Sequence, residues 1–146
     1  MIITPEDLAD NFHEEDLRQI ELNKYRLGAT EVTILDLAAS WAAHVEKIDT
    51  DRPKSMLDRT AWGGYDLLAA MSMRSSFENC LHAFSGPIVS RLKDTIKPFD
   101  DRFRSITVPD TKGLVQSFAD EDTSTRPWWW HRIPDSGPIL EELLRQ

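Results

Sequence analysis

The chain has 146 residues and a formal net charge of −8, and 40% of its residues are hydrophobic. This length fits one domain, and the composition is ordinary for a globular protein. A single cysteine, Cys80, excludes a framework of internal disulfides, and the longest stretch without charged side chains, Asn79–Ser90, is too short to span a membrane. We therefore expect one cytoplasmic domain, residues 1–146, with no membrane contact.

The negative charge is concentrated in the first part of the chain. Residues 1–60 carry 13 acidic and seven basic side chains, whereas residues 61–110 carry six of each. Residues 111–146 carry six acidic and four basic side chains. Because an acidic surface repels phosphate groups, we expect no duplex DNA partner, and a basic protein surface suits it better. The alternative is that the charges only keep the protein in solution, as charge runs commonly do.

The first half of the chain has the signals of two helices. Thr4-Pro5 predicts a helix start, with the Thr hydroxyl as the cap and Pro in the first turn. A helix over Arg18–Leu27 follows, with Gly28 as its C-terminal cap. The second helix has apolar residues at alternating spacings of four and three, which predicts one buried face. These residues are Ile34, Ala38, Trp41, Val45 and Ile48.

Two further helices are predicted in the middle of the chain. A short helical piece at Ser55–Thr60 precedes Gly63-Gly64, and a long helix then covers about Tyr65–Phe84. Gly86-Pro87 starts the next helix, whose apolar stripe keeps its phase across Pro98. We therefore predict one kinked helix there rather than two separate ones. The stripe consists of Leu92, Ile96, Phe99, Phe103 and Ile106.

The last part of the chain, residues 111–146, is predicted to be an arm. It combines a short helix at Leu114–Phe118, a polar loop at Asp120–Arg126 and a last helix at Ile139–Arg145. The three tryptophans of the arm lie in a segment that we expect to be extended, since it is flanked by prolines. Nowhere is there an alternation long enough to predict a strand. The fold class is therefore all-α, a bundle of about four helices in residues 1–110 with the arm and its terminal helix packed across it.

The tryptophan run is the first candidate site. Trp128, Trp129 and Trp130, followed by His131 and Arg132, can hold a flat or cationic ligand or the aromatic anchor of a partner. No regular element points three successive side chains the same way, so at least one indole should face away from the core. The alternative is structural, with the arm closing a groove between helices and an arginine stacked on an outer indole.

The second candidate is a set of polar residues on one helix. Arg74, Glu78 and His82 are four residues apart, and Glu78 would orient His82 as a general base. The alternative is a solvated face with ordinary pairing between successive turns. Further metal ligands are not indicated, so we expect no metal site, no cofactor and no catalytic residue. Cys80 lies in an apolar stripe, which predicts a buried and unreactive thiol.

These features favour a small acidic interaction or regulatory protein, a binding, inhibitory or immunity-type module without catalysis. The acidic first part, the tryptophan arm, or both would bind a protein partner, and self-association is a further option. For self-association, the basic residues Lys93, Lys97 and Arg104 would meet the acidic part of a second copy. The alternative function is a small-molecule-binding protein or small enzyme with a pocket under Trp128–Trp130.

Overall fold

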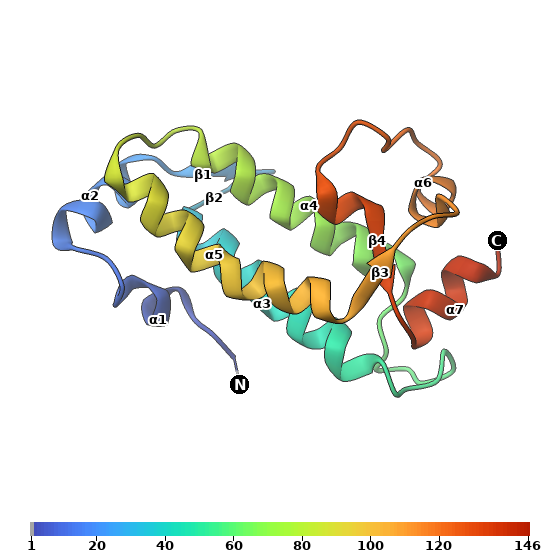
Figure 1. Ribbon diagram of the computed structural model, residues 1–146. Coiled ribbons are helices and arrows are strands. Elements are labelled where there is room, and N and C mark those ends of the chain that lie inside the picture. Colours follow the sequence, from blue (N-terminus) through green and yellow to red (C-terminus); the bar gives the residue numbers. More distant parts are fainter. Residues whose placement is uncertain (1) are drawn as a thin grey trace. The chain divides into compact units, whose positions relative to one another are not determined.

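The computed structural model describes residues 2–146, and these residues are mostly helical, as predicted (Figure 1). The helices are α1 (Pro5–Ala9), α2 (Glu14–Leu22), α3 (Ile34–Asp51), α4 (Gly64–Leu81), α5 (Pro87–Ser105), α6 (Leu114–Ala119), the 3₁₀ turn η1 (Trp128–His131) and α7 (Pro138–Leu144). The strands are β1 (Tyr25–Leu27), β2 (Thr30–Val32), β3 (Thr107–Pro109) and β4 (Arg132–Pro134). They form two small antiparallel sheets, β1–β2 and β3–β4.

The chain forms two compact units. The first unit contains the described residues up to Ala43 together with Met73–Asp100. The second unit contains His44–Ser72 and Asp101–Gln146. Helices α3, α4 and α5 each contribute residues to both units, and the two units are described separately below.

The first unit begins with two short capped helices. The backbone N–H of Asp7 donates to the Thr4 hydroxyl, and the Thr4 N–H donates to the Asp7 carboxylate, so each satisfies a donor that the helix start leaves open. Pro5 occupies the first turn of α1, as its missing N–H permits. The buried apolar side chains of these helices and of the turn between them are Leu8, Phe12 and Ile20.

The predicted helix over Arg18–Leu27 is wrong at its C-terminal end. Helix α2 ends at Leu22, and Tyr25–Leu27 pairs as a strand with Thr30–Val32. Gly28 has a φ of 64° and begins the two-residue turn between the strands, so it serves the hairpin rather than a helix end. The aromatic and β-branched residues around this turn stabilise the extended pairing.

The core of the first unit comes from the predicted apolar stripes. Ile34, Ala38 and Trp41 of α3 are buried, as expected from their spacing. Helix α5 passes through Pro98 without a break, which confirms the prediction of one helix there. The apolar residues of α4, α5 and the turn between them that are buried in this unit are Phe77, Cys80, Leu81, Phe84, Ile88, Leu92 and Ile96.

In the second unit, Asp51 at the end of α3 organises the connection to α4. Its carboxylate, which is only 1% exposed, accepts from the ammonium groups of Lys47 at 2.7 Å and Lys54 at 2.9 Å. It also accepts from the N–H of Trp62 at 2.8 Å. These bonds hold residues 52–63 in a series of turns, so the helical piece predicted at Ser55–Thr60 is wrong. Polar side chains of the segment bond to their own neighbours, which competes with a helix.

The C-terminal part of the second unit forms the small sheet β3–β4 and the turn η1. Strand β3 follows α5 directly, and Val108 lies opposite Ile133 in the ladder. The extended segment predicted for the tryptophans is wrong, because the N–H of Trp130 donates to the carbonyl of Pro127 and closes a 3₁₀ turn. The predicted terminal helix is confirmed as α7, which begins at Pro138.

Candidate functional site

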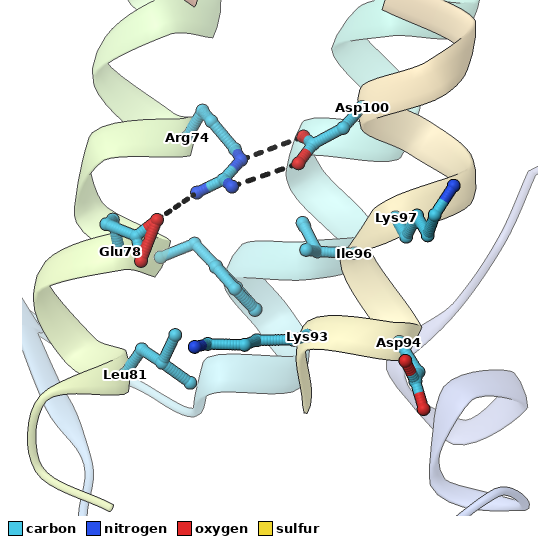
Figure 2. A pocket seen from close by; sticks show the side chains of 9 residues that line it. Arg74, Glu78, Leu81, Lys93, Asp94, Ile96, Lys97 and Asp100 are labelled. Carbon is cyan, nitrogen blue, oxygen red and sulfur yellow. Dashed lines mark hydrogen bonds and ion pairs between the residues drawn. The ribbon is translucent and has the colours of Figure 1, made fainter. Parts of the chain in front are cut away.

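A pocket of about 290 Å³ lies between α4 and α5 in the first unit (Figure 2). Helix α4 contributes side chains from successive turns of one face, and α5 does the same from the opposite wall. The residues that line the pocket are Arg74, Phe77, Glu78, Leu81, Lys93, Asp94, Ile96, Lys97 and Asp100. Its size is close to the lower end of what small-molecule sites use.

One end of the pocket is closed by the ion pair of Arg74 with Asp100. The Arg74 Nε donates to Asp100 Oδ1 at 2.8 Å, and Nη2 donates to Oδ2 at 3.0 Å. The indole N–H of Trp41 also donates to Asp100 Oδ1, at 2.9 Å. Both charged residues are buried, with 4% of Arg74 and 7% of Asp100 exposed. Because α3, α4 and α5 each supply one member, this cluster fixes the three helices to one another in the first unit.

Two oppositely charged side chains occupy the walls of the pocket below this ion pair. Glu78 of α4 accepts one long hydrogen bond of 3.4 Å from Arg74 Nη1. Lys93 of α5 extends its ammonium group across the pocket toward α4, beside Leu81 (Figure 2). Asp94 and Lys97 point away from the centre of the pocket in the same view. Within residues 2–146, Lys93 forms no ion pair of 4.0 Å or less.

Sequence reasoning identified this site in part. Arg74 and Glu78 both line the pocket, so the solvated face that served as the alternative is wrong for Arg74. His82 is exposed and is absent from the pocket lining. The partners Asp100 and Trp41 were missed, since they lie 26 and 33 residues from Arg74 and only the tertiary fold brings them together. The one signal in the sequence was that Arg74 occupies a position on the apolar face of its predicted helix, where a charged residue is rarely buried without a partner.

The three tryptophans of η1 lie in the second unit and differ in exposure. Trp129 is 2% exposed, and its indole N–H donates to the carbonyl of Met71 at 3.1 Å. Trp130 is 6% exposed, with the guanidinium of Arg126 at 4.4 Å from its ring centroid. Trp128 is half-buried and is covered by the guanidinium of Arg104 at 3.7 Å. A 3₁₀ turn separates successive side chains by about 120°, which is why the three rings have different surroundings.

His131 and Arg132 are held by backbone and hydroxyl oxygens of the second unit. His131 is exposed, and its Nε2 lies 2.8 Å from the carbonyl oxygen of Arg126. Arg132 donates from Nε to the Thr107 hydroxyl and from Nη2 to the Thr107 carbonyl, both at 2.8 Å. These bonds tie β4 and the turn before it to the end of α5 and to β3. Binding of a partner by the arm stays a prediction.

Several carboxylates of the chain are held by ion pairs and hydrogen bonds that shift their pKa values. Hydrogen bonds from the Arg102 guanidinium lower the pKa of Asp49, and those from Arg91 lower the pKa of Asp16. Burial alone would raise the pKa of Asp51, but its three hydrogen bonds together lower it. The predicted burial of Cys80 is confirmed, and burial raises the pKa of its thiol to about 11, which favours low reactivity.

The acidic segment, residues 6–21, lies in α1, α2 and the turn between them. It carries seven acidic side chains and one basic side chain. Asp16 is buried against Arg91, which binds both of its carboxylate oxygens at 2.9 Å. The other six carboxylates are exposed, and Glu15 pairs with Arg18 while Glu21 pairs with Lys24. Within residues 2–146, Glu6, Asp10 and Glu14 form no ion pair.

Among residues 2–146, no cluster of three or more His, Cys, Asp and Glu side chains is arranged to hold a metal ion. In the same part of the chain, none of the helices combines the length and the apolar character that crossing a membrane requires. Comparisons with protein-family models, with curated proteins and with solved structures found no match.

Proposed function

We propose that this chain is a small, non-catalytic interaction protein whose acidic segment binds a basic surface on a protein partner. The observation that carries the proposal is the set of exposed carboxylates on α1 and α2, of which Glu6, Asp10 and Glu14 lack a cationic partner within residues 2–146. Unpaired charges of one sign raise the rate of association with an oppositely charged partner and select against partners of like charge.

The state of the titratable groups also favours binding over catalysis. General acids are carboxyls whose pKa is raised, and reactive thiols have a lowered pKa. Here Asp16, Asp49 and Asp51 have lowered pKa values because cations and N–H groups stabilise their charged forms, and Cys80 shifts upward. These pKa shifts are typical of carboxylates in structural ion pairs rather than of groups that transfer protons in catalysis.

The tryptophan arm also supports an interface on the acidic segment, because most of the arm is already packed within the second unit. Trp129 and Trp130 are buried, and their indoles already contact Met71 and Arg126. We infer that the arm mainly closes the second unit, with Trp128 and His131 as its accessible members. The interface would then lie on the acidic segment of the first unit. In the same proposal, the principal helices form a bundle of one domain, and the protein acts in the cytoplasm.

The test is capture of partners by the full chain, followed by cross-linking that maps the contact. The contact should fall on residues 6–21 and on a lysine- and arginine-rich surface of the partner. Substituting Glu6→Gln, Asp10→Asn and Glu14→Gln together should weaken binding about tenfold, equivalent to ~1.4 kcal/mol. A matched control with the same change in net charge carries Glu31→Gln, Asp94→Asn and Glu141→Gln, three exposed acids outside the segment. Equal affinities of the two variants, or cross-links elsewhere, would contradict the proposal.

A further inference from the structure

The pocket between α4 and α5 holds two oppositely charged side chains, one from each helix, that do not pair with each other. Glu78 projects from one wall and Lys93 from the other (Figure 2), and no contact of 4.0 Å or less joins their charged groups. The deeper pair, Arg74 and Asp100, is satisfied by its own two hydrogen bonds. The Glu78 carboxylate, held by its long 3.4 Å contact with Arg74, and the Lys93 ammonium therefore face the same space of about 290 Å³.

The balance of charge in the pocket selects the class of ligand. Of the residues that line the pocket, three are cationic, namely Arg74, Lys93 and Lys97, and three are anionic, namely Glu78, Asp94 and Asp100. A lone anion or a lone cation is therefore attracted by some of these side chains and repelled by as many others. A ligand that carries both charges close together can meet both walls, since each of its groups replaces water on an opposite partner.

The floor of the pocket is apolar. It consists of three buried side chains that line the pocket, Phe77 and Leu81 from α4 and Ile96 from α5. Glu78 and Lys93 line the same pocket, and the stems of such long charged residues commonly cover apolar surface. A ligand that binds the charged ends of both Glu78 and Lys93 would separate them and bring an apolar group onto this floor.

We propose that the pocket binds a small zwitterion with an apolar side chain, the chemistry of a free aliphatic α-amino acid. Its ammonium group meets the Glu78 carboxylate, its carboxylate meets the Lys93 ammonium, and its side chain lies on Phe77, Leu81 and Ile96. This binding is independent of the proposed protein interface, because the acidic segment supplies none of the groups that line the pocket.

The test is a titration of the full chain with L-leucine, followed by amide chemical shifts. Saturable shifts confined to residues 74–81 and 93–100, with a Kd of about 1 mM, are expected. Two half-ligands separate the charges, since 3-methylbutylamine lacks the carboxylate and 4-methylpentanoate lacks the ammonium group. Each should bind at least about tenfold more weakly, because the amine leaves Lys93 and the carboxylate leaves Glu78 without a partner from the ligand. Saturation by either half-ligand at the concentration that L-leucine needs would overturn the proposal, as would the absence of saturable shifts.

Variants of the pocket give a second readout. Glu78→Gln and Lys93→Met should each weaken L-leucine binding about tenfold. Glu31→Gln and Lys112→Met are matched controls, since these exposed side chains lie outside the pocket. They should leave the affinity unchanged. Circular dichroism checks that each variant is folded. A loss of binding that is equal in the controls and in the Glu78 and Lys93 variants would overturn the assignment.

Discussion

At the scale of single residues, Asp100 shows how one carboxylate can specify the arrangement of three helices. Its two oxygens accept from Nε and Nη2 of the Arg74 guanidinium and from the Trp41 indole, so its burial is compensated by three donors. A buried ion pair need not add net stability, yet removal of one partner leaves the other charge buried alone. The pair therefore acts mainly by making alternative helix packings unfavourable, because any packing that separates Arg74 from Asp100 leaves a buried charge unpaired.

Substitution of Asp100 tests this role. Asp100→Leu should lower the free energy of unfolding by about 3–5 kcal/mol, because it leaves the buried Arg74 with its long 3.4 Å contact to Glu78 in place of the Asp100 pair. The double variant Arg74→Met/Asp100→Leu should recover most of that loss, because it removes both charges together. Urea denaturation of the two single variants and the double variant measures the coupling energy. A double variant as unstable as the sum of the single variants would show that the two side chains act independently.

The tryptophans give a second prediction at this scale. Trp129→Ala should destabilise the chain by about 3–5 kcal/mol, since it empties a buried volume and removes the donor to the Met71 carbonyl. Trp128→Ala should cost clearly less, because this ring is half-buried and its main partner is the exposed guanidinium of Arg104. The measurement is again urea denaturation. The reverse order of the two losses would contradict the packing described for η1.

At the scale of elements, the connection between α3 and α4 depends on a single charge. Asp51 binds Lys47, Lys54 and the N–H of Trp62, and its pKa is lowered from the usual value of 3.8. A carboxyl whose pKa is lower in the folded state stabilises the fold above the pKa of the unfolded chain. This contribution is lost as the pH falls through the lower, folded value.

The expected result is a loss of stability on acidification that depends on Asp51. The wild-type free energy of unfolding should fall between pH 6 and pH 3, and Asp51→Asn should be less stable by about 1–3 kcal/mol at pH 6, with a shallower decline. Asp94→Asn, an exposed change on α5, should keep the wild-type slope. An Asp51→Asn variant with the wild-type slope would contradict the role given to this carboxylate.

The elements also show what the sequence can predict. Helices α3, α4 and α5 were predicted from apolar spacings, because a buried helix face repeats every three or four residues. The hairpin β1–β2 and the sheet β3–β4 were not predicted, since each strand has only three residues and no alternation can develop. Gly28 was assigned to a helix end because a positive φ suits either that end or a hairpin turn, and local sequence does not separate the two.

The candidate sites were predictable to a smaller extent. Arg74 and Glu78 share a helix face, so their proximity follows from spacing alone. Asp100, which binds Arg74, and Lys93, which faces Glu78 across the pocket, come from another helix, so their proximity depends on how α4 and α5 pack in the first unit. The different surroundings of Trp128, Trp129 and Trp130 depend on the 3₁₀ turn, which the flanking prolines did not reveal. The acidic segment, in contrast, is visible from composition alone.

At the scale of the whole molecule, we predict that the chain unfolds as one domain. Helices α3, α4 and α5 each contribute residues to both compact units, so separate unfolding of one unit would create new helix ends with unsatisfied backbone groups. Hydrogen exchange at increasing urea concentration measures this in peptides from α2, in the first unit, and α7, in the second. Protection should be lost at the same urea midpoint in both. Two separate midpoints would contradict the one-domain prediction.

The central claim is that unpaired carboxylates of the acidic segment form the interface with a basic partner. The most direct test is the Kd of the partner identified by cross-linking, measured for the wild type, for Glu6→Gln/Asp10→Asn/Glu14→Gln and for the charge-matched control. We expect the segment variant to bind about tenfold more weakly than the control at low salt, and the difference to shrink as added salt screens the charges. The same affinity for both variants, at every salt concentration, would contradict the claim.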